Sequence, residues 1–418
     1  MPPHRHDVLV VGGGPAGAAT AYWLARRGHD VAVLEKKTFP REKTCGDGLT
    51  PRAVKQLCDM GLEPALSHFH RFEGLRTLAH GITLDLEWPQ HPDYPSYGYV
   101  VRRRDLDQLV AQRAVEAGAK LREGAEAIRP LVEGGLVTGA VVRDRSGATD
   151  EVRARFVVIA DGANSRFGRS LGTARNRSWP LGMAIRGYVR SPLHDDPWIE
   201  STLDLRDRQG NSLPGYGWVF PVGDGWINVG VGLLSTFRDY KRVNTTNLIE
   251  EYVATLPEHW GVTPDSERTE PVGGRLPMAG SVNPKVGPTW IVVGDAAGSV
   301  NPFNGEGIDY AYETGRLAAD LLDEALLSGD ALALARYTRL LDEEYGLYFK
   351  VARLFARVIG NPTLMRELTL VGMQSRTLME WVLRIMANLL REDELGPAEA
   401  AYRAIAAMVR HVPEAATV

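Results

Sequence analysis

The stretch "DVLVVGGGPAGAATAYWLARRGHDVAVLE", residues 7–35, constrains the fold of this chain more than any other. A short apolar, β-branched run leads into glycines, a segment with helical spacing follows, and a second apolar run ends at Glu35. Strand, helix and strand in this order predict a βαβ unit. Gly12, Gly14 and Gly17, between the first strand and the helix, have the G-x-G-x-x-G spacing of a dinucleotide-binding turn.

Each glycine of this turn has its own role in holding a dinucleotide. The first allows the tight turn, the second lets the pyrophosphate approach the backbone, and the third lets the helix pack closely on the strand. Glu35 lies eighteen residues past Gly17 (35 minus 17), where its carboxylate accepts hydrogen bonds from ribose hydroxyls. Pro15 and Ala16 in the turn, and Lys36 after the acid, are predicted to contact the same cofactor. The alternative is a glycine turn in a doubly wound protein that binds no nucleotide.

The composition excludes several classes of protein. Of 418 residues, 44% are hydrophobic and 24% charged, and the net charge of -4 gives no reason to expect a nucleic-acid partner. The two cysteines, Cys45 and Cys58, are too few for a disulfide framework and lack metal-ligand spacing, which favours a reducing compartment. We find neither an N-terminal secretion signal nor an apolar run of the roughly 18 to 20 residues that span a bilayer. We therefore expect a cytoplasmic location, with any membrane contact peripheral on the cytoplasmic face.

The stretch "GDAAGSVNPFNGEGI", which begins at Gly294, distinguishes between the dinucleotides NAD and FAD. Asp295 follows a predicted strand, where its side chain is placed to bond a polyol such as the ribityl chain of FAD. Gly305 and Gly307 then precede a helix at Ile308, and a helix N-terminus aimed at the flavin ring stabilises the negative charge that builds there on reduction. The stretch predicts FAD. The alternative for Asp295 is a helix N-cap.

Strand, helix and turn signals divide the chain into an α/β FAD-binding lobe, an interleaved antiparallel β-sheet lobe for the substrate, and a helical C-terminal region. The β-rich lobe is assigned where aromatic and β-branched runs alternate with turns. The helical region is assigned where Leu, Ala, Arg and Glu dominate. The predicted boundaries are 1–75, 101–175 and 275–330 for the FAD lobe, 76–100 and 176–274 for the β-rich lobe, and 331–418 for the helical region.

Three segments together resemble a known superfamily. "GGGPAG", "ADGANS" around Asp161 and Gly162, and "VGDAAGSVNPFNGEGI" are similar to the three FAD motifs of the p-hydroxybenzoate-hydroxylase-like flavoproteins. The resemblance implies a Rossmann-like lobe of the glutathione-reductase and p-hydroxybenzoate-hydroxylase type, with Asp161 at the cofactor. Arg103, in "VVRRRDLDQL", matches the arginine that this superfamily places near the flavin phosphates. Arg102 and Arg104 are alternatives in register, and a solvated charge at a helix start is the alternative role.

Two further stretches resemble one family within this superfamily. "TCGDGL" is similar to the C-G-x-G segment of the geranylgeranyl reductase family, and "YGWVFPVGDGWINVG" is similar to its Y-x-W-x-F-P signature. Members are FAD enzymes that saturate isolated C=C bonds in prenyl chains, including those of geranylgeranyl diphosphate, chlorophyll, membrane-lipid ethers and menaquinones. The stretch "CGDGLTPRAV" most resembles the bacterial menaquinone reductases. The resemblance implies reduction of the isoprenoid tail of menaquinone, or otherwise of a geranylgeranyl lipid.

Tyr216, Trp218 and Phe220 are the predicted substrate-binding residues. In a strand they point to the same face by two-residue alternation, which makes an aromatic wall suited to a prenyl chain. The alternative is that these rings only attach the sheet to the FAD lobe.

The segment from Cys45 to Gly48 follows the Glu35 strand and is expected to run beside the flavin, because its glycines permit close approach. Cys45, Gly46 and Asp47 are accordingly predicted at the cofactor, with Asp47 orienting the loop. A thiol of ordinary pKa near 8.5 is a weak acid for protonating an alkene. We therefore interpret Cys45 as a catalytic residue that borders the reacting double bond, shaping the site or relaying a proton. The alternative is a small buried hydrophobe.

Electrons must come from a transient donor, because the chain has no second G-x-G-x-x-G unit for NAD(P)H. NAD(P)H, a ferredoxin and a reduced quinone remain open as donors. Three other functions also remain open on this fold: a flavin monooxygenase that hydroxylates an aromatic or lipid substrate, a flavin-dependent halogenase, and a flavin-bearing redox sensor without turnover.

The stretch "LMEWVLRIMANLLRE" has apolar residues at helical spacing, flanked by Arg384 and Arg391. The apolar residues are Leu378, Trp381, Val382, Ile385, Leu389 and Leu390. A basic amphipathic helix of this kind lies in a membrane interface and would give the enzyme access to a lipid-dissolved quinone. The alternative is core packing against the FAD lobe.

Overall fold

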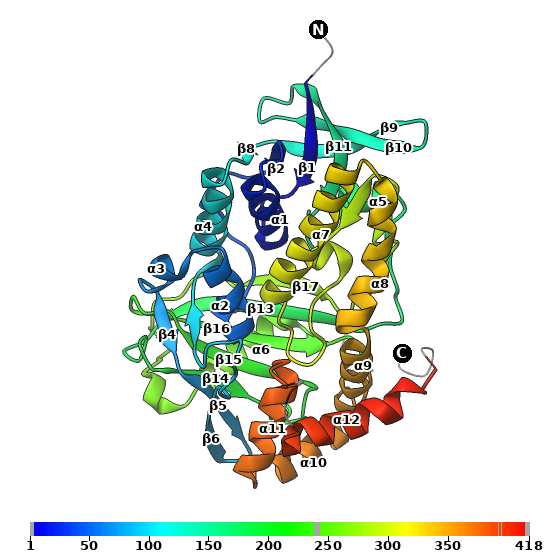
Figure 1. Cartoon of the computed structure of the whole chain (residues 1–418). Coiled ribbons are helices and arrows are strands. Elements are labelled where there is room, and N and C mark those ends of the chain that lie inside the picture. The colour runs from blue at the N-terminus through cyan, green and yellow to red at the C-terminus, as the bar shows by residue number, and fades with distance from the viewer. Residues whose placement is uncertain (1–3, 238–242, 392, 394, 414–418) are drawn as a thin grey trace.

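The computed structural model describes residues 4–237, 243–391, 393 and 395–413, and it contains two large sheets (Figure 1). The first sheet has eight strands built around the predicted βαβ unit. They are β1 (Arg5–Val11), β2 (Val31–Glu35), β8 (Lys120–Glu123), β9 (Glu126–Glu133), β10 (Leu136–Arg143), β11 (Thr149–Ile159), β19 (Val286–Gly287) and β20 (Trp290–Val292). The main order is β19-β20-β11-β1-β2-β8, and β9 and β10 form a hairpin joined to β11.

The parallel strands bring the predicted cofactor loops to one edge of this sheet. β1 lies between β11 and β2 and is parallel to both, so the chain leaves β1 on one side and returns to it on the other. Gly12 after β1, Glu35 at the end of β2 and Asp161 after β11 consequently share the carboxyl edge, and Asp295 follows the adjacent β20. Such a switch point is where doubly wound sheets bind their ligands.

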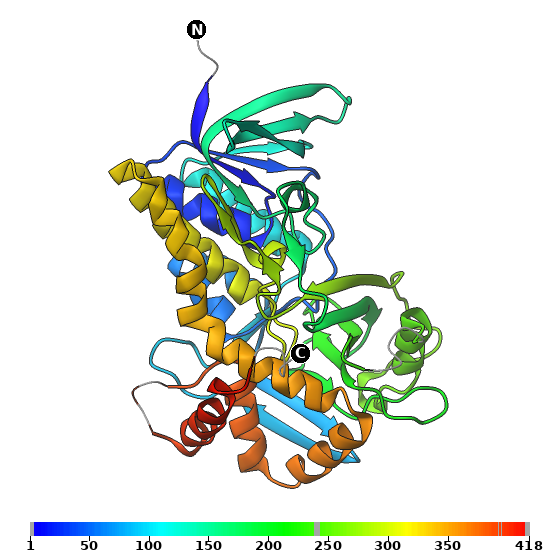
Figure 2. The same ribbon diagram turned by 90° about the vertical axis from the view of Figure 1, so that its right-hand side faces the viewer.

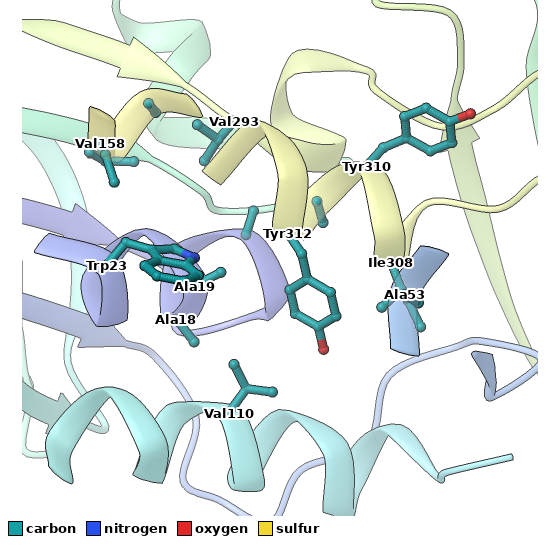
Figure 3. Packing of buried hydrophobic residues seen from close by; sticks show 14 of the residues in the cluster. Ala18, Ala19, Trp23, Ala53, Val110, Val158, Val293, Ile308, Tyr310 and Tyr312 are labelled. Carbon is teal, nitrogen blue, oxygen red and sulfur yellow. The ribbon is translucent and has the colours of Figure 1, made fainter. Parts of the chain in front are cut away.

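Three helices cover one face of the first sheet: α1 (Pro15–Arg26), α4 (Arg103–Glu116) and α7 (Ile308–Ser328). Helices α1 and α7 pack closely because both carry small residues at their contact. A Cβ on Gly315 of α7 would lie 2.6 Å from the backbone oxygen of Ala16 on α1. Figure 3 shows Tyr312 of α7 pointing toward Val110 of α4, beside Ala18 and Ala19 of α1. This tight packing fixes the N-termini of α1 and α7 relative to the carboxyl edge.

The second sheet has seven strands, in the order β17-β13-β16-β15-β14-β5-β6. Their bounds are β5 (Gly74–Ala79), β6 (Ile82–Glu87), β13 (Leu181–Arg190), β14 (Trp198–Thr202), β15 (Gly215–Pro221), β16 (Trp226–Leu234) and β17 (Val272–Pro277). All pairs are antiparallel except β14 with β5. The helix α6 (Thr245–Ala254) packs on one face, where alternate side chains such as Val219 and Val229 form a separate core.

Shorter elements connect the two sheets. They are β3 (Gly48–Leu49), β4 (His70–Phe72) and β7 (Gly98–Val100), which form a three-stranded sheet; β12 (Ala174–Arg175) and β18 (Val282–Asn283), which pair with each other; and the helices α2 (Pro51–Asp59), α3 (Glu63–Leu66), α5 (Arg166–Ser170), η2 (Glu258–Trp260), η3 (Gly294–Ala297) and η4 (Ala331–Arg336).

The C-terminal region is helical, and part of it lies against the second sheet. It comprises α8 (Tyr337–Leu341), a π-helical turn η5 (Asp342–Gly346), α9 (Leu347–Ile359), α10 (Pro362–Gly372), α11 (Arg376–Met386) and α12 (Pro397–Arg410). Figure 2 shows these orange and red helices beside the blue strands β5 and β6. The helix predicted to continue to Leu390 instead ends at Met386, and Asn388 adopts a positive φ of 53°. The predicted fold class, an α/β lobe with an interleaved β-sheet and C-terminal helices, is confirmed.

Candidate active site

A cavity of about 1260 Å³ lies between the carboxyl edge of the first sheet, the second sheet and helices α9 to α11. This volume exceeds the roughly 300 to 1,000 Å³ of a site for one drug-sized ligand, so the cavity has room for a cofactor and a second molecule. All but two of the predicted site residues line it. They are Gly12, Gly14, Pro15, Ala16, Glu35, Lys36, Cys45, Gly46, Asp47, Arg103, Asp161, Tyr216, Trp218, Phe220, Asp295, Gly305, Gly307 and Ile308.

Gly17 and Gly294 are the two predicted cofactor residues that do not line the cavity. A Cβ on Gly17 would lie 1.9 Å from the backbone oxygen of Gly12, and a Cβ on Gly294 would lie 2.7 Å from the Cβ of Ala16. Neither position has room for a side chain, because neighbouring backbone and helix α1 fill the space. Both glycines therefore allow close packing around α1, the role already expected for Gly17, and their contact with the cofactor stays a prediction.

The N-terminus of α1 opens on the cavity. Gly12 adopts a φ of 106°, and a Cβ there would lie 2.3 Å from the backbone oxygen of Ala160. Gly14 caps the helix without any side-chain hydrogen bond, and Pro15 is its first residue. The amide groups of the first turn therefore lack side-chain partners and carry the positive end of the helix dipole. This arrangement fits a pyrophosphate.

Glu35 is buried at the end of β2 and is held as a hydrogen-bond acceptor. Its Oε2 accepts from the backbone N–H of Gly13 at 3.1 Å, and its Oε1 accepts from that of Lys37 at 2.9 Å. Arg41, which the sequence analysis did not single out, bridges Glu35 at 3.3 Å and Asp107 at 2.9 Å. The neighbouring Lys36 is exposed and lines the cavity. An acceptor-only carboxylate here fits the adenosine ribose.

Two further features at the cavity fit the flavin half of FAD. Oδ2 of Asp161 accepts from the backbone N–H of Phe167 at 3.0 Å, whereas its buried Oδ1 has no hydrogen-bond partner. An unpartnered buried oxygen is costly, and a ligand hydroxyl would satisfy it. Helix α7 starts at Ile308, behind Gly307, and its N-cap also makes no side-chain hydrogen bond. The cavity thus meets two uncapped helix N-termini, one at the first cofactor motif and one at the third.

Arg103 is the arginine that faces this site. It lines the cavity and is buried, and its guanidinium is held by Asp107 at 2.7 and 2.9 Å. Arg102 instead pairs with Asp224, and Arg104 is exposed. These positions support Arg103 over its two neighbours in register.

The loop from Cys45 to Gly48 packs against the aromatic wall. Tyr216, Trp218 and Phe220 share one face of β15, with successive ring centroids 5.9 and 6.3 Å apart. A Cβ on Gly46 would lie 3.0 Å from Phe220, and one on Gly48 would lie 3.1 Å from the same ring. The glycines therefore bring the loop against the wall itself, a contact that the sequence analysis had assigned to the flavin.

Asp47 and Asn228 join this loop to the second sheet through buried hydrogen bonds. Nδ2 of Asn228 donates to Oδ2 of Asp47 at 2.8 Å and to the backbone oxygen of Cys45 at 2.9 Å. Its Oδ1 accepts from Nε1 of Trp218 at 2.9 Å. Asp47 also accepts from the Tyr188 hydroxyl at 2.5 Å, and it holds a positive φ of 67°. The contacts support the proposal that Asp47 orients the loop.

Burial raises the pKa of the Cys45 thiol above its usual value, and the nearby charge of Asp47 raises this pKa further, while Arg103 lowers it. The thiol therefore stays protonated at neutral pH and is a weaker acid than an exposed cysteine. Burial likewise raises the pKa of Asp47, against the opposing effects of Arg186, Tyr188 and Asn228.

Comparison with known proteins places this geometry in a family. A sequence profile described as an FAD binding domain matches residues 5–339. The chain belongs to this FAD-binding family. Among curated relatives of this flavoprotein, the menaquinone reductase of Mycobacterium tuberculosis is 42% identical over 389 residues, which is 93% of this chain and 92% of the relative. Digeranylgeranylglycerophospholipid reductase 1 of Methanopyrus kandleri is 34% identical over 361 residues, 84% of this chain and 90% of the relative.

A solved structure shares the fold of the flavoprotein. It is a geranylgeranyl bacteriochlorophyll reductase-like protein from Thermoplasma acidophilum, with a TM-score of 0.78, 24% identity and coverage of 96% of this chain and 99% of that one. The predicted family, the FAD cofactor and the class of FAD-dependent oxidoreductase are confirmed. The uncapped helix N-termini at the cavity fit the phosphate groups of this cofactor.

Several residues around the cavity of this flavoprotein were missed from the sequence. Asn228 and Glu306 lie inside two of the motifs quoted above, but neither residue was among the predicted site residues of its motif. Their polar side chains within otherwise apolar or glycine-rich stretches were the available signal. Arg41 and Tyr188 had no such signal, because their partners are 66 and 141 residues away in the chain (107 minus 41 and 188 minus 47).

Helix α11, which contains most of the predicted amphipathic stretch, has a role that neither the membrane nor the core-packing interpretation included. Leu378 and Val382 of α11 line the cavity of the flavoprotein. Arg384 pairs with Glu399 at 3.1 Å, and Arg391 pairs with Asp393 at 3.3 Å. Both arginines are therefore neutralised by acidic partners and do not form the basic face that the membrane prediction required.

A Cys45→Ala variant of the flavoprotein is expected to retain FAD and to lose roughly 10- to 100-fold in turnover, because the loop beside the aromatic wall loses a packing group and shifts. The pH dependence of turnover is expected to stay that of the wild type, since burial makes the thiol too weak an acid to donate the proton. Turnover followed by lipid mass spectrometry from pH 6 to 9 tests this. A pH profile that changes on substitution would instead make the thiol the proton donor.

Proposed function

We propose that this protein reduces an isolated C=C bond in the isoprenoid tail of menaquinone, with FAD as its cofactor. Relatives named menaquinone reductase are similar over 93% of the chain, and more distant relatives are named for prenylated glycerophospholipids. A geranylgeranyl lipid is the alternative substrate of the same reaction.

The observation that carries this proposal is the division of the cavity by polarity. Charged lining residues, such as Glu35, Arg103 and Asp295, come from the cofactor motifs. The lining contributed by β5, β6, β14 and helices α9 to α11 is uncharged and mostly apolar. It consists of Leu75, Thr77, Leu86, Ile199, Ser201, Phe355, Ile359, Met365, Leu368, Thr369, Gly372, Leu378, Met379, Val382, Leu383 and Met386. The polar end of the cavity therefore suits a nucleotide, and its apolar end suits a prenyl chain.

The chemistry requires that the protein hold the double bond, exclude water and deliver a proton. Reduced FAD supplies a hydride to one carbon of the double bond. Tyr216, Trp218 and Phe220 offer aromatic faces along which an alkene lies flat. The hydroxyl of Tyr216 is engaged, because it donates to the backbone oxygen of Asn304 at 2.6 Å. Its role is to fix the wall against the start of α7.

The experiment that tests the proposal is anaerobic. The purified flavoprotein is reduced with dithionite and mixed with menaquinone or geranylgeranyl diphosphate, and flavin reoxidation is followed together with the mass of the extracted lipid. A gain of two hydrogens that persists after air oxidation of the quinone headgroup is the expected result. Headgroup reduction alone, or no change in mass with either lipid, would contradict it and direct the test to oxygen consumption by a monooxygenase.

The electron donor is part of the same proposal. NAD(P)H, a ferredoxin and a reduced quinone remain the candidates, and replacing dithionite by each in turn in the anaerobic assay distinguishes them.

We further propose a peripheral membrane contact through α10. No helix within the described part of the chain is long and apolar enough to cross a membrane. Leu364, Leu368 and Val371 of α10 are nonetheless 46%, 48% and 64% exposed, and Leu368 also lines the cavity. An exposed apolar helix face at the rim of an apolar cavity suits entry of a lipid-dissolved chain.

A Leu364→Glu/Val371→Glu variant is expected to bind phospholipid vesicles at least about tenfold more weakly, because the introduced charges must stay in water. Sedimentation with vesicles measures the binding. The matched control is Leu327→Glu, since Leu327 at the far end of α7 is 77% exposed and does not line the cavity. Equal sedimentation of the two variants would remove α10 as the contact.

A further inference from the structure

Three carboxylates form a row along one side of α7 and its N-terminus. Asp309 and Glu313 are four residues apart on one face of α7, and Glu306 lies two residues before the first residue of this helix, Ile308. Arg52 of α2 is their cation: its Nη2 lies 2.6 Å from Glu313, and its Nε lies 3.7 Å from Asp309. The Tyr345 hydroxyl also donates to Glu313, at 2.9 Å.

The row holds more acid than its cation can neutralise. Among the residues that the structure describes, Arg52 is the only cation paired with the three carboxylates. The side chain of Asp309 is fully buried, and neither of its carboxylate oxygens meets the geometry of a hydrogen bond. Two uncompensated negative charges in this environment are too costly to persist. The row therefore keeps at least one proton at neutral pH.

Glu306 is the member of the row that reaches the cavity. It is half-buried and lines the cavity between Gly305 and Gly307, whereas neither Asp309 nor Glu313 lines it. The Thr50 hydroxyl donates to its Oε1, and Nδ2 of Asn304 donates to its Oε2 at 3.3 Å. The backbone oxygen of the same Asn304 receives the Tyr216 hydroxyl. Glu306 thus contacts Thr50, two residues past the Cys45 loop, and Asn304, which holds Tyr216 of the aromatic wall.

Four of the other ionisable side chains that line the cavity are engaged by their neighbours or held neutral. Glu35 accepts two backbone hydrogen bonds and is paired with Arg41. Asp47 accepts from Asn228, Tyr188 and the backbone of Arg103. The Tyr216 proton is already donated, and the Cys45 thiol is held neutral by burial.

We propose that Glu306 is the general acid of the reaction and that Asp309 and Glu313 return a proton to it from the outer end of the row. The assignment rests on the proposed prenyl reduction. The π bond of the alkene breaks, one carbon receives the hydride from reduced FAD, and the other carbon receives the proton from a carboxyl oxygen of Glu306. Two C–H bonds form, FAD is left oxidised, and the Glu306 carboxylate is reprotonated from solvent through Glu313, whose side chain keeps 9% of its surface exposed.

The electrostatics of the row agree with this role. Burial raises the pKa of Glu306 to about 7, against lowering contributions from Thr50 and Arg52. Burial also raises the pKa of Asp309, and the charges of Glu306 and Glu313 raise it further. A general acid works best when its pKa lies near the working pH. The ionisable groups that face Glu306 are Arg52 on α2, Asp309 and Glu313 on α7, Tyr216 on β15, and Tyr348 on α9.

The test compares Glu306→Gln with the wild-type holoprotein in single turnovers of the anaerobic assay at pH 5.5 to 9. Glutamine keeps the shape and one acceptor oxygen for Nδ2 of Asn304, while its amide N–H donates to the Thr50 hydroxyl, and it has no acidic proton. The matched control is Glu200→Gln. Glu200 is also buried, and its pKa is also raised by burial to about 7. It faces away from the cavity, while its neighbours Ile199 and Ser201 line it.

The wild-type rate is expected to be level below pH 7 and to fall tenfold per pH unit above it, because the donor must be protonated. Glu306→Gln is expected to retain FAD, to react about 100-fold more slowly or worse, and to lose this pH dependence, whereas Glu200→Gln keeps it. A second readout is independent of turnover. The infrared band of a protonated carboxyl that titrates near pH 7 in the oxidised holoprotein is expected to disappear in Glu306→Gln.

Two outcomes separate the proposals. Wild-type protein that adds no hydrogens to any prenyl chain overturns the proposed function and the donor assignment with it. Wild-type protein that saturates the chain while Glu306→Gln matches its rate and pH profile overturns the donor assignment alone. If Glu306→Gln does not fold, a wild-type rate that stays level from pH 6 to 9 overturns the assignment without any variant.

Discussion

A Gly12→Ala variant is expected to purify without FAD. Gly12 has a φ of 106°, a conformation that costs an L-residue about 1 to 3 kcal/mol. A Cβ there would also lie 2.3 Å from the backbone oxygen of Ala160, and backbone atoms on both sides of this contact are fixed by strand pairing. The turn must move, and with it the uncapped N-terminus of α1. We expect the affinity for FAD to fall by at least about 100-fold, which corresponds to a loss of about 3 kcal/mol in binding free energy.

The ratio of flavin to protein absorbance after purification, together with titration of the deflavinated protein, measures this loss. Gly346→Ala is the matched control. Gly346 has a helical backbone and does not line the cavity, and an added Cβ would come no closer than 3.6 Å to Asp342. Full flavin content in Gly12→Ala would show that the turn tolerates a side chain, contrary to the geometry.

An Asn228→Ala variant is expected to lose prenyl reduction while keeping FAD. Asn228 is fully buried, and its side-chain amide forms hydrogen bonds with Trp218, Asp47 and Cys45. Truncation leaves a buried indole N–H and part of a buried carboxylate without partners, which costs about 2 to 5 kcal/mol of stability. The Cys45 loop and the aromatic wall then lose their fixed spacing. We expect turnover to fall by about 100-fold, because a shift near 1 Å at a reacting centre has that effect.

Chemical denaturation followed by flavin fluorescence measures the stability, and the anaerobic assay measures turnover. Asn211→Ala is the control with the same substitution, since Asn211 is exposed and its amide makes a hydrogen bond only to Asp207. Its stability is expected to change by less than about 0.5 kcal/mol. Wild-type turnover in Asn228→Ala would show that the wall and the loop are positioned independently.

The cofactor half of the site could be predicted from the sequence because its residues lie close together in the chain. The turn from Gly12 to Gly17 lies within one βαβ unit, and its spacing is set by the geometry of a single strand-to-helix connection. Glu35 follows from the length of the helix and of the next strand. Even here spacing alone does not tell a cofactor contact from a close approach of backbone, because Gly17 and Gly294 do not line the cavity and are closely packed against Gly12 and Ala16.

The substrate half was only partly accessible. Two-residue alternation placed Tyr216, Trp218 and Phe220 on one face, and the structure puts that face on the cavity. The role of α11 was not predictable, because an apolar stripe at helical spacing has the same pattern whether it faces a core, a membrane or a cavity. Its arginines were interpreted as a basic face, but their partners Glu399 and Asp393 neutralise them.

The sequence by itself determined the βαβ cofactor unit, the identity of the cofactor and the family, since these depend on residues a few positions apart whose spacing reflects the period of a strand or a helix. Only the tertiary structure decided which groups share the cavity. Asn228 meets Cys45 across 183 positions, and Arg52 meets Glu313 across 261. Such pairs are formed by the packing of two sheets and a helical region, and the cost of burying a charge then determines which carboxylate keeps its proton.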